Sequence, residues 1–118
     1  MGITPRYDLE GKHFIACENT GSGEVSAQTV FAYHQERELI WAFYSGGEIV
    51  RGHLLGCYIA EDRLAFSYHH INNAGVLMTG TCETVITEDA WGDLLLNETW
   101  EWTSGDLSSG TSVLVETS

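Results

Sequence analysis

The chain has 118 residues, of which 43% are hydrophobic, so it can form one globular domain but has little material for a second. Its formal net charge of -12 at pH 7, from 17 acidic and 5 basic residues, repels phosphate backbones and anionic lipid surfaces, so we expect no nucleic-acid and no membrane partner. Three cysteines without a CxxC spacing argue against a disulfide framework and a zinc site, and we expect them to be reduced, small core residues. An N-terminus without the apolar run of a signal peptide favours a cytoplasmic protein.

Strand patterns dominate the first half of the chain. Residues 1–10 are expected to form a loose lead-in to a single domain over residues 11–118. Within that domain, alternating or apolar segments occur at 12–18, 24–34, 39–45 and 49–59. Turn-forming residues separate them, with NTGSG at 19–23, QERE at 35–38 and Gly46-Gly47 as the plainest two-residue hairpin signal.

The second half of the chain continues in the same way. Strand patterns lie at 63–71, 76–85, 94–103 and 111–116. Short turn sequences precede the first of these segments and separate the others. Residues 87–92 form the longest connector, in which 87–90 are compatible with one helical turn. No apolar spacing repeats every three to four residues over ten positions, so no long helix is predicted.

An all-β fold follows from this order of elements. Eight strands joined in sequence by short turns form a meander, and eight antiparallel strands can close into a barrel with space for side chains or one small ligand. Closure removes both exposed sheet edges, whereas a sandwich requires a long crossover connection that this chain lacks. We therefore predict a single eight-stranded antiparallel up-and-down β-barrel.

The segment 94–103, with the sequence LLLNETWEWT, places one carboxylate among large apolar groups. Its alternation puts on one face Leu94, Leu96, Glu98, Trp100 and Trp102. A buried carboxylate is costly without a partner or a proton. Glu98 therefore either ties strands together by pairing with Arg51, His53 or tyrosine hydroxyls, or serves as a ligand acceptor or general base whose pKa burial raises.

Alternation also predicts which other side chains point into the barrel. The strand at 49–59 fits two inner faces, one with Val50, Leu54 and Tyr58, and the other with Arg51, His53, Leu55 and Cys57. We favour the second face because its basic groups would give Glu98 partners. The complete predicted ligand-binding set is Tyr33, Trp41, Phe43, Arg51, His53, Tyr68, His70, Glu98, Trp100 and Trp102.

Histidines and tryptophans suggest further roles. Adjacent strand residues point to opposite faces, so we predict an inward His70 and a surface His69 in place of a metal pair. The other histidines have no compact ligand spacing, and we expect no metal and no cofactor.

Trp100 and Trp102 share a face that is typical of a packed core and also of a stacking wall for a flat ligand. Trp91, in the long connector, is expected to form a lid or a plug at the barrel end.

Several motifs together carry a resemblance to a known family. The segments LEGKHF, NTGSGEV, FYSGGEIVRGHLLG, SYHHIN, TGTCE and NETWEWTSGDLSSG resemble small bacterial proteins with an avidin-like or lipocalin-like barrel, over about residues 9–116. The resemblance implies this fold and small-molecule binding in the barrel mouth. Members of the family often carry the transferred name N-acetylglutamate synthase. An acetyltransferase of that kind needs a mixed α/β domain with a loop that cradles the coenzyme A pyrophosphate, and this sequence contains no such loop.

These observations support three functional hypotheses. The first is a protein that holds a small hydrophobic or aromatic molecule in the barrel cavity. The second is a small barrel enzyme, a cyclase or isomerase, in which Glu98 or His70 acts as acid or base. The third is a self-associating structural protein, such as a homodimer, whose outer faces include Ile40, Ala42 and Tyr44.

Overall fold

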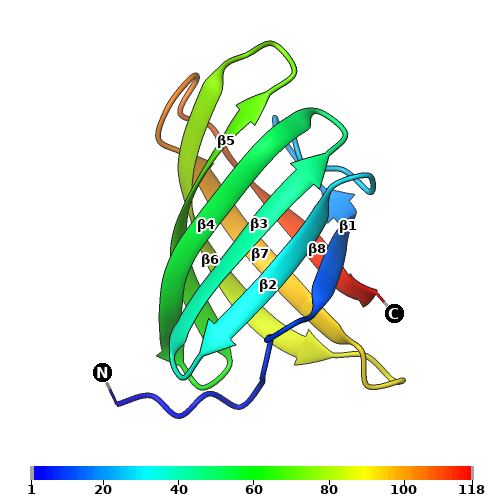
Figure 1. Cartoon of the computed structure of the whole chain (residues 1–118), viewed down its shortest axis with the longest axis vertical. Helices are drawn as coiled ribbons and strands as arrows, with labels where there is room; N and C mark the ends of the chain where they lie inside the picture. Colours follow the sequence, from blue (N-terminus) through cyan, green and yellow to red (C-terminus); the bar gives the residue numbers. More distant parts are fainter. Residues whose placement is uncertain (1, 118) are drawn as a thin grey trace.

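The computed structural model describes residues 2–117, and eight strands lie in that range. They are β1 (His13–Asn19), β2 (Val30–Glu36), β3 (Leu39–Gly46), β4 (Ile49–Ala60), β5 (Arg63–Asn72), β6 (Leu77–Glu88), β7 (Leu94–Trp102) and β8 (Ser109–Thr117). Each strand pairs antiparallel with the next, and β1 pairs with β8 to close the barrel (Figure 1). The predicted eight-stranded antiparallel barrel is confirmed. No helix in residues 2–117 is long and apolar enough to span a membrane.

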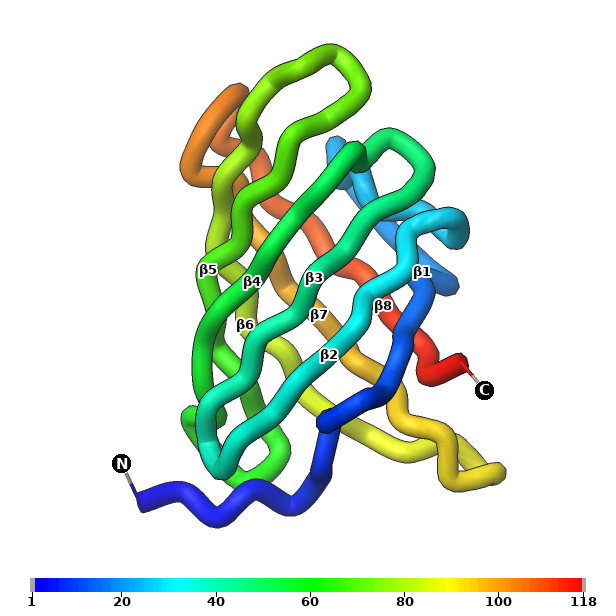
Figure 2. Tube along the Cα trace, in the orientation of Figure 1, coloured from blue at the N-terminus to red at the C-terminus, as the bar shows by residue number. Residues whose placement is uncertain are grey.

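Two strand boundaries differ from the prediction by three residues or more. β2 begins at Val30, and β1 pairs with β2 at three positions, because residues 20–29 leave the sheet as a loop at one end of the barrel (Figure 2). β6 continues to Glu88, so the predicted helical turn at 87–90 is wrong. The chain turns one residue later, where the Asp89 carboxylate accepts hydrogen bonds from the backbone N–H groups of Trp91 and Asp93 at 2.9 and 3.0 Å.

The segment before β1 packs against the end of the barrel opposite that loop (Figure 1). Leu9 is fully buried, and its N–H donates to Gln35 Oε1 at 3.0 Å. Gln35 Nε2 in turn donates to the Tyr7 carbonyl at 3.0 Å, and the Tyr58 hydroxyl donates to Gln35 Oε1 at 2.9 Å. The predicted loose lead-in is therefore held to the barrel by apolar burial and by hydrogen bonds.

Inward-facing side chains on β3 and β4 correct the sequence prediction. On β3 the buried residues are Ile40, Ala42 and Tyr44, which had been placed on the outer face. Both faces of β3 are apolar, so alternation alone could not orient this strand. On β4 the register shifts between Ile49 and Arg51, and beyond this bulge Gly52, Leu54 and Tyr58 face inward.

Four glycines lie directly opposite large aromatic residues on neighbouring strands. The cross-strand pairs are Tyr44–Gly52, Phe66–Gly56, Tyr68–Gly80 and Trp100–Gly110. At Gly52, Gly80 and Gly110 the aromatic ring occupies the space of the absent Cβ, which at Gly52 would lie 2.4 Å from the Tyr44 ring. A Cβ at Gly56 would instead meet the Ala65 carbonyl oxygen and the Phe66 Cβ. The glycines thus allow aromatic rings to lie flat along the inner wall of the barrel.

The three cysteines are free in this structure. Cys82 is buried, in agreement with the expectation of a small core residue, whereas Cys57 is half-buried on the outer face of β4 and does not belong to the core. Cys17 is exposed, so the core expectation is wrong for this residue.

Candidate functional site

A cavity opens at the barrel end that carries the β1–β2 loop. Inward-facing residues of all eight strands and residues 23–25 of that loop line the cavity. The interior space is about 40 Å³, enough for a few water molecules at roughly 10–15 Å³ each. With the part open to solvent, the depression has about 440 Å³. The aromatic lining residues are Phe31, Tyr44, Phe66, Tyr68, Trp100 and Trp102, and the polar ones are Asn19, Glu24, His70, Glu98 and Ser112.

Aromatic rings form one corner of the cavity. Trp102 lies 5.7 Å from Trp100 and 5.7 Å from Tyr68 between ring centroids, with interplanar angles of 56° and 64°. These tilted and edge-to-face arrangements are favourable for aromatic pairs. Gly80 and Gly110 leave room for the Tyr68 and Trp100 rings, so the positions of these rings depend on the glycines opposite them.

A chain of hydrogen bonds links Glu24, His70 and Tyr44 at the mouth. His70 Nε2 lies 2.8 Å from Glu24 Oε1, and His70 Nδ1 lies 3.0 Å from the Tyr44 hydroxyl. A single neutral tautomer satisfies both contacts, with Nε2–H donating to Glu24 and the Tyr44 hydroxyl donating to Nδ1. Asn72 Nδ2 also donates to Glu24 at 3.1 Å. These bonds fix the β1–β2 loop across the mouth, and burial keeps the Tyr44 hydroxyl protonated by raising its pKa.

Glu98 lies deeper in the cavity and is poorly paired. It is 8% exposed, and among residues 2–117 its hydrogen-bond partner is Ser112, whose hydroxyl donates to Oε1 at 2.8 Å. Burial raises the pKa of Glu98 to about 7, and the Ser112 hydrogen bond opposes this rise. The sequence suggested Arg51 and His53 as partners of Glu98. Both side chains lie outside the barrel, so neither pairs with Glu98.

The structure brings together five of the predicted site residues. Tyr68, His70, Glu98, Trp100 and Trp102 all line the cavity. The predicted inward His70 is confirmed, since it is 2% exposed, and His69 lies on the surface as expected.

Five other predicted residues lie elsewhere. Tyr33 is fully buried but packs edge-to-face on Phe14, with ring centroids 5.3 Å apart, and does not line the cavity. The inward orientation predicted for four more residues is wrong, because they stand on the outer face of β3 and β4: Trp41, Phe43, Arg51 and His53. Phe43 is 54% exposed and contacts His53 at 5.0 Å between ring centroids.

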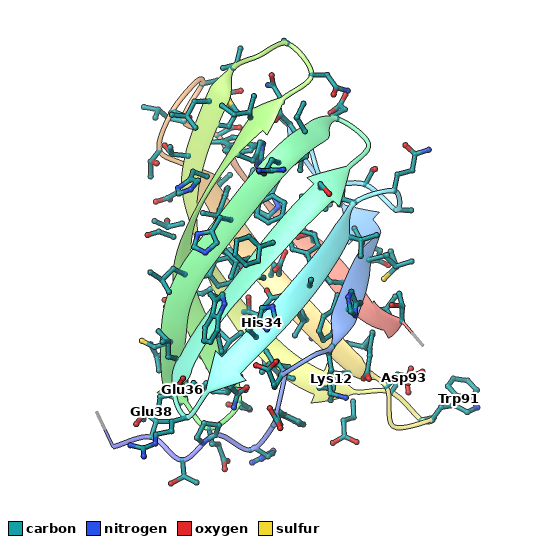
Figure 3. The ribbon with its side chains drawn as sticks, in the orientation of Figure 1. Lys12, His34, Glu36, Glu38, Trp91 and Asp93 are labelled. Carbon is teal, nitrogen blue, oxygen red and sulfur yellow. The ribbon has the colours of Figure 1, made fainter. Side chains whose placement is uncertain are left out.

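Trp91 is also displaced from its expected role. It is 86% exposed and projects from the β6–β7 connection away from the barrel (Figure 3). The prediction of a lid or plug at the barrel end is therefore wrong.

Sequence reasoning missed several cavity residues. Glu24 lies in the β1–β2 loop, which has no periodic pattern, although the cluster NTGSGE that precedes β2 marks an unusually polar connection. Asn19 ends β1, and its Nδ2 donates to the Val25 carbonyl at 2.7 Å while its buried Oδ1 has no partner among the described residues. Ser112 is opposite Glu98 in the β7–β8 register, a relation that depends on strand pairing.

A closed meander barrel with an aromatic-lined cavity at one mouth defines the class of small ligand-binding barrels. The model of the avidin-like protein family matches residues 7–117, and the chain belongs to this family. Avidin-like barrels commonly bind small ligands and form oligomers. Searches of curated proteins and of solved structures gave no match. The family match gives no support to the name N-acetylglutamate synthase.

Proposed function

We propose that this protein binds a small hydrophobic or aromatic molecule in the barrel cavity. The observation that carries the proposal is an open cavity whose walls are aromatic and whose few polar groups include a buried carboxylate. Binding sites for small molecules usually combine apolar walls with a small number of placed polar groups. Membership of a family that commonly binds small ligands supports the same function.

In this proposal the cavity residues have distinct roles. Trp100, Trp102 and Tyr68 contact the end of the ligand that enters the cavity, and Glu98 accepts a hydrogen bond from that end. His70 holds Tyr44 and the β1–β2 loop in position, because both of its ring nitrogens are already hydrogen-bonded. The narrow interior limits the buried part of the ligand to a few heavy atoms.

Tryptophan fluorescence provides a direct test with a metabolite library. A compound that enters the cavity should quench the emission of the wild-type protein, and Trp100→Ala should abolish that response. The matched control is Trp91→Ala, which removes a tryptophan that is 86% exposed and remote from the cavity. Quenching that survives Trp100→Ala and disappears in Trp91→Ala would place the ligand elsewhere.

A second candidate function is acid–base catalysis, as in a small cyclase or isomerase. It is favoured by the pKa of about 7 at Glu98, because a general acid or base works best when its pKa is near the working pH. His70 is less suited, since Glu24 and Tyr44 occupy its nitrogens. Turnover of a substrate that is unchanged in Glu98→Gln would exclude Glu98 from such a role.

We also propose that two copies associate through the outer face of β3, β4 and β5. The exposed large apolar residues of this face are Leu39, Phe43, Val50, Leu55, Ile59 and Ile71. These strands contain no Asp or Glu, in a chain with 17 acidic residues. This face therefore combines exposed apolar side chains with Arg51 and Arg63, and it lacks the negative charge that would keep two copies apart.

A further inference from the structure

Beyond the general binding role, the geometry points to a ligand with a cationic, hydrogen-bond-donating head group, such as an organic ammonium ion, held by Glu98 beside Trp100 and Trp102. The inference rests on the proposed function and specifies the chemistry of its ligand. Four observations support it: the charges that line the cavity, the hydrogen-bond acceptor positions of Glu98 that no described residue fills, the aromatic rings of Tyr68, Trp100 and Trp102, and the size of the interior.

The charge of the lining favours a cation. Glu24 and Glu98 are the acidic lining residues, and no Lys or Arg is among the residues that line the cavity. A carboxylate or phosphate group placed there would be buried beside like charges without a basic partner, which is unfavourable. An ammonium group would instead supply the missing counter-charge, and the net charge of -12 would attract it over longer distances.

The two acids differ in how completely they are already bonded. Glu24 accepts hydrogen bonds from His70 and Asn72, at 2.8 and 3.1 Å. Glu98 accepts one, from Ser112 at 2.8 Å, although an ionised carboxylate has about four acceptor positions. Glu98 is therefore the group whose ionised form gains most from a ligand N–H donor.

The aromatic corner completes the recognition of a cation. The centroids of Trp100 and Trp102 are 5.7 Å apart, with the rings tilted by 56°, and Tyr68 packs on Trp102 from β5. A cation within about 6 Å of an aromatic centroid is attracted to the ring face, most strongly for tryptophan. Tilted rings beside a carboxylate form a partial cage that suits an alkylammonium head group better than a hydroxyl or a carboxylate.

The interior volume limits the head group and leaves the remainder of the ligand at the mouth. About 40 Å³ accommodates an ammonium-sized group, and the wider depression of about 440 Å³ accommodates a ring or chain. A ligand such as an arylalkylamine would therefore insert its charged end and leave its apolar body near the β1–β2 loop.

Three probes with one benzene ring test this selectivity: benzylamine, benzyl alcohol and benzoate. Titration of the wild-type protein near pH 8, followed by tryptophan fluorescence and calorimetry, should show benzylamine binding about tenfold or more tightly than either other probe. Equal affinities, or a preference for benzoate or benzyl alcohol, would overturn the cation proposal and leave the binding function intact. If neither these probes nor any library compound binds, both proposals fail.

Variants then identify the partner of the cation. Glu98→Gln should weaken benzylamine binding by about tenfold or more, because it removes the charge and keeps the shape. The matched control is Glu101→Gln on the same strand, which makes the same charge change on an exposed, outward side chain and should not alter the affinity. Equal weakening in both variants would indicate long-range attraction alone and would contradict direct contact with Glu98.

The pH dependence gives an independent readout. Benzylamine affinity should rise by about tenfold from near pH 6 to near pH 8 in the wild-type protein, as Glu98 ionises with a pKa of about 7. Other titratable groups face Glu98 from β2, β3, β5 and β6, and burial raises the pKa of each above this range: Tyr33, Tyr44, Tyr68 and Cys82. Strands β1, β4, β7 and β8 contribute Asn19, Leu54, the two tryptophans and Ser112, which do not titrate.

Glu24 and His70 form the remaining ionisable pair at the cavity mouth. Their contribution is separated by repeating the pH series with Glu98→Gln, in which the rise in affinity should disappear. A rise that persists in this variant would assign the pH dependence to Glu24 and His70 and would overturn the assignment to Glu98.

Discussion

At Glu98, the cost of burying a charge couples the stability of the fold to pH. Its pKa is about 7 in the folded protein, compared with an ordinary value of 4.5, so the folded state holds this proton more tightly than the unfolded chain. The contribution of the protonated carboxyl to stability is complete below about pH 4.5 and is lost as the pH rises through 7. At about 1.4 kcal/mol for each pKa unit, the loss amounts to at most about 3.5 kcal/mol.

Glu98→Gln should remove this dependence, because glutamine stays neutral and can still accept the Ser112 hydrogen bond. We expect the free energy of unfolding of the variant, relative to that of the wild type, to increase by about 2–3 kcal/mol between pH 5 and pH 8.5. Urea denaturation of both proteins at the two pH values measures this difference. A constant difference would mean that the Glu98 carboxyl is solvated or paired in the folded protein.

The pairing of glycines with aromatic rings is a property of neighbouring strands. A Cβ at Gly52 would lie 2.4 Å from the Tyr44 ring and 2.9 Å from the His70 Cβ. Gly52→Ala should therefore cost roughly 1–3 kcal/mol of stability through overcrowding. In a Tyr44→Ala background the same substitution should cost less, because the Tyr44 ring is gone and the contact with the His70 Cβ at 2.9 Å is the one that remains. Urea denaturation of the four proteins in this cycle gives the coupling, and additive effects would contradict the paired arrangement.

The segment before β1 gives a second prediction about an element. Leu9 is fully buried, so Leu9→Ala should lower the free energy of unfolding by about 2–5 kcal/mol, as for other large-to-small core substitutions. Val50→Ala is the control, since Val50 is 58% exposed and should change stability by less than about 0.5 kcal/mol. Equal, small effects in the two variants would show that residues 3–12 do not contribute to the folded barrel.

Prediction from sequence succeeded for strands whose two faces differ and failed where they do not. On β7, alternating apolar and polar residues oriented Glu98, Trp100 and Trp102 correctly. On β3 both faces are apolar, and Trp41 and Phe43 stand outside while Ile40, Ala42 and Tyr44 face the core. On β4 a bulge reverses the parity of the alternation after Ile49. Side-chain periodicity does not reveal a bulge, so both faces of this strand fitted the sequence. The face with Arg51 and His53 was favoured because it would give Glu98 basic partners, and that choice is wrong.

Contacts between distant segments were also inaccessible to sequence reasoning. Glu24 reaches His70 across 46 positions of the chain, and only the closed barrel brings the β1–β2 loop beside the end of β5. The fold itself was predictable because every connection is short and the strands pair in sequence order. The cavity required knowledge of which loop crosses the mouth, and loops lack the periodicity from which strands are inferred.

In the whole molecule, charge and apolar surface are separated in a way that predicts self-association. The acidic residues lie outside β3, β4 and β5, whose outer face presents Phe43 at 54% exposure and Leu55 at 52%. Outward side chains on these strands are visible beside His34 in Figure 3. Two copies can therefore meet through this face with their acidic surfaces directed away from each other. We expect a dimer in solution, and added salt should strengthen it by screening the residual repulsion.

Phe43→Glu should shift this dimer to monomer, because it replaces an apolar contact at the centre of the interface with a charged side chain on each copy. The control is Trp91→Glu, which introduces the same charge at an aromatic residue that is 86% exposed at the β6–β7 connection and should leave the dimer intact. Size-exclusion chromatography with light scattering measures the mass of each protein. A wild-type monomer at high concentration would refute the proposed interface, and a Phe43→Glu dimer would move it to another face. Since the cavity opens at the barrel end and the interface lies on the barrel side, the Phe43→Glu monomer should keep its ligand affinity.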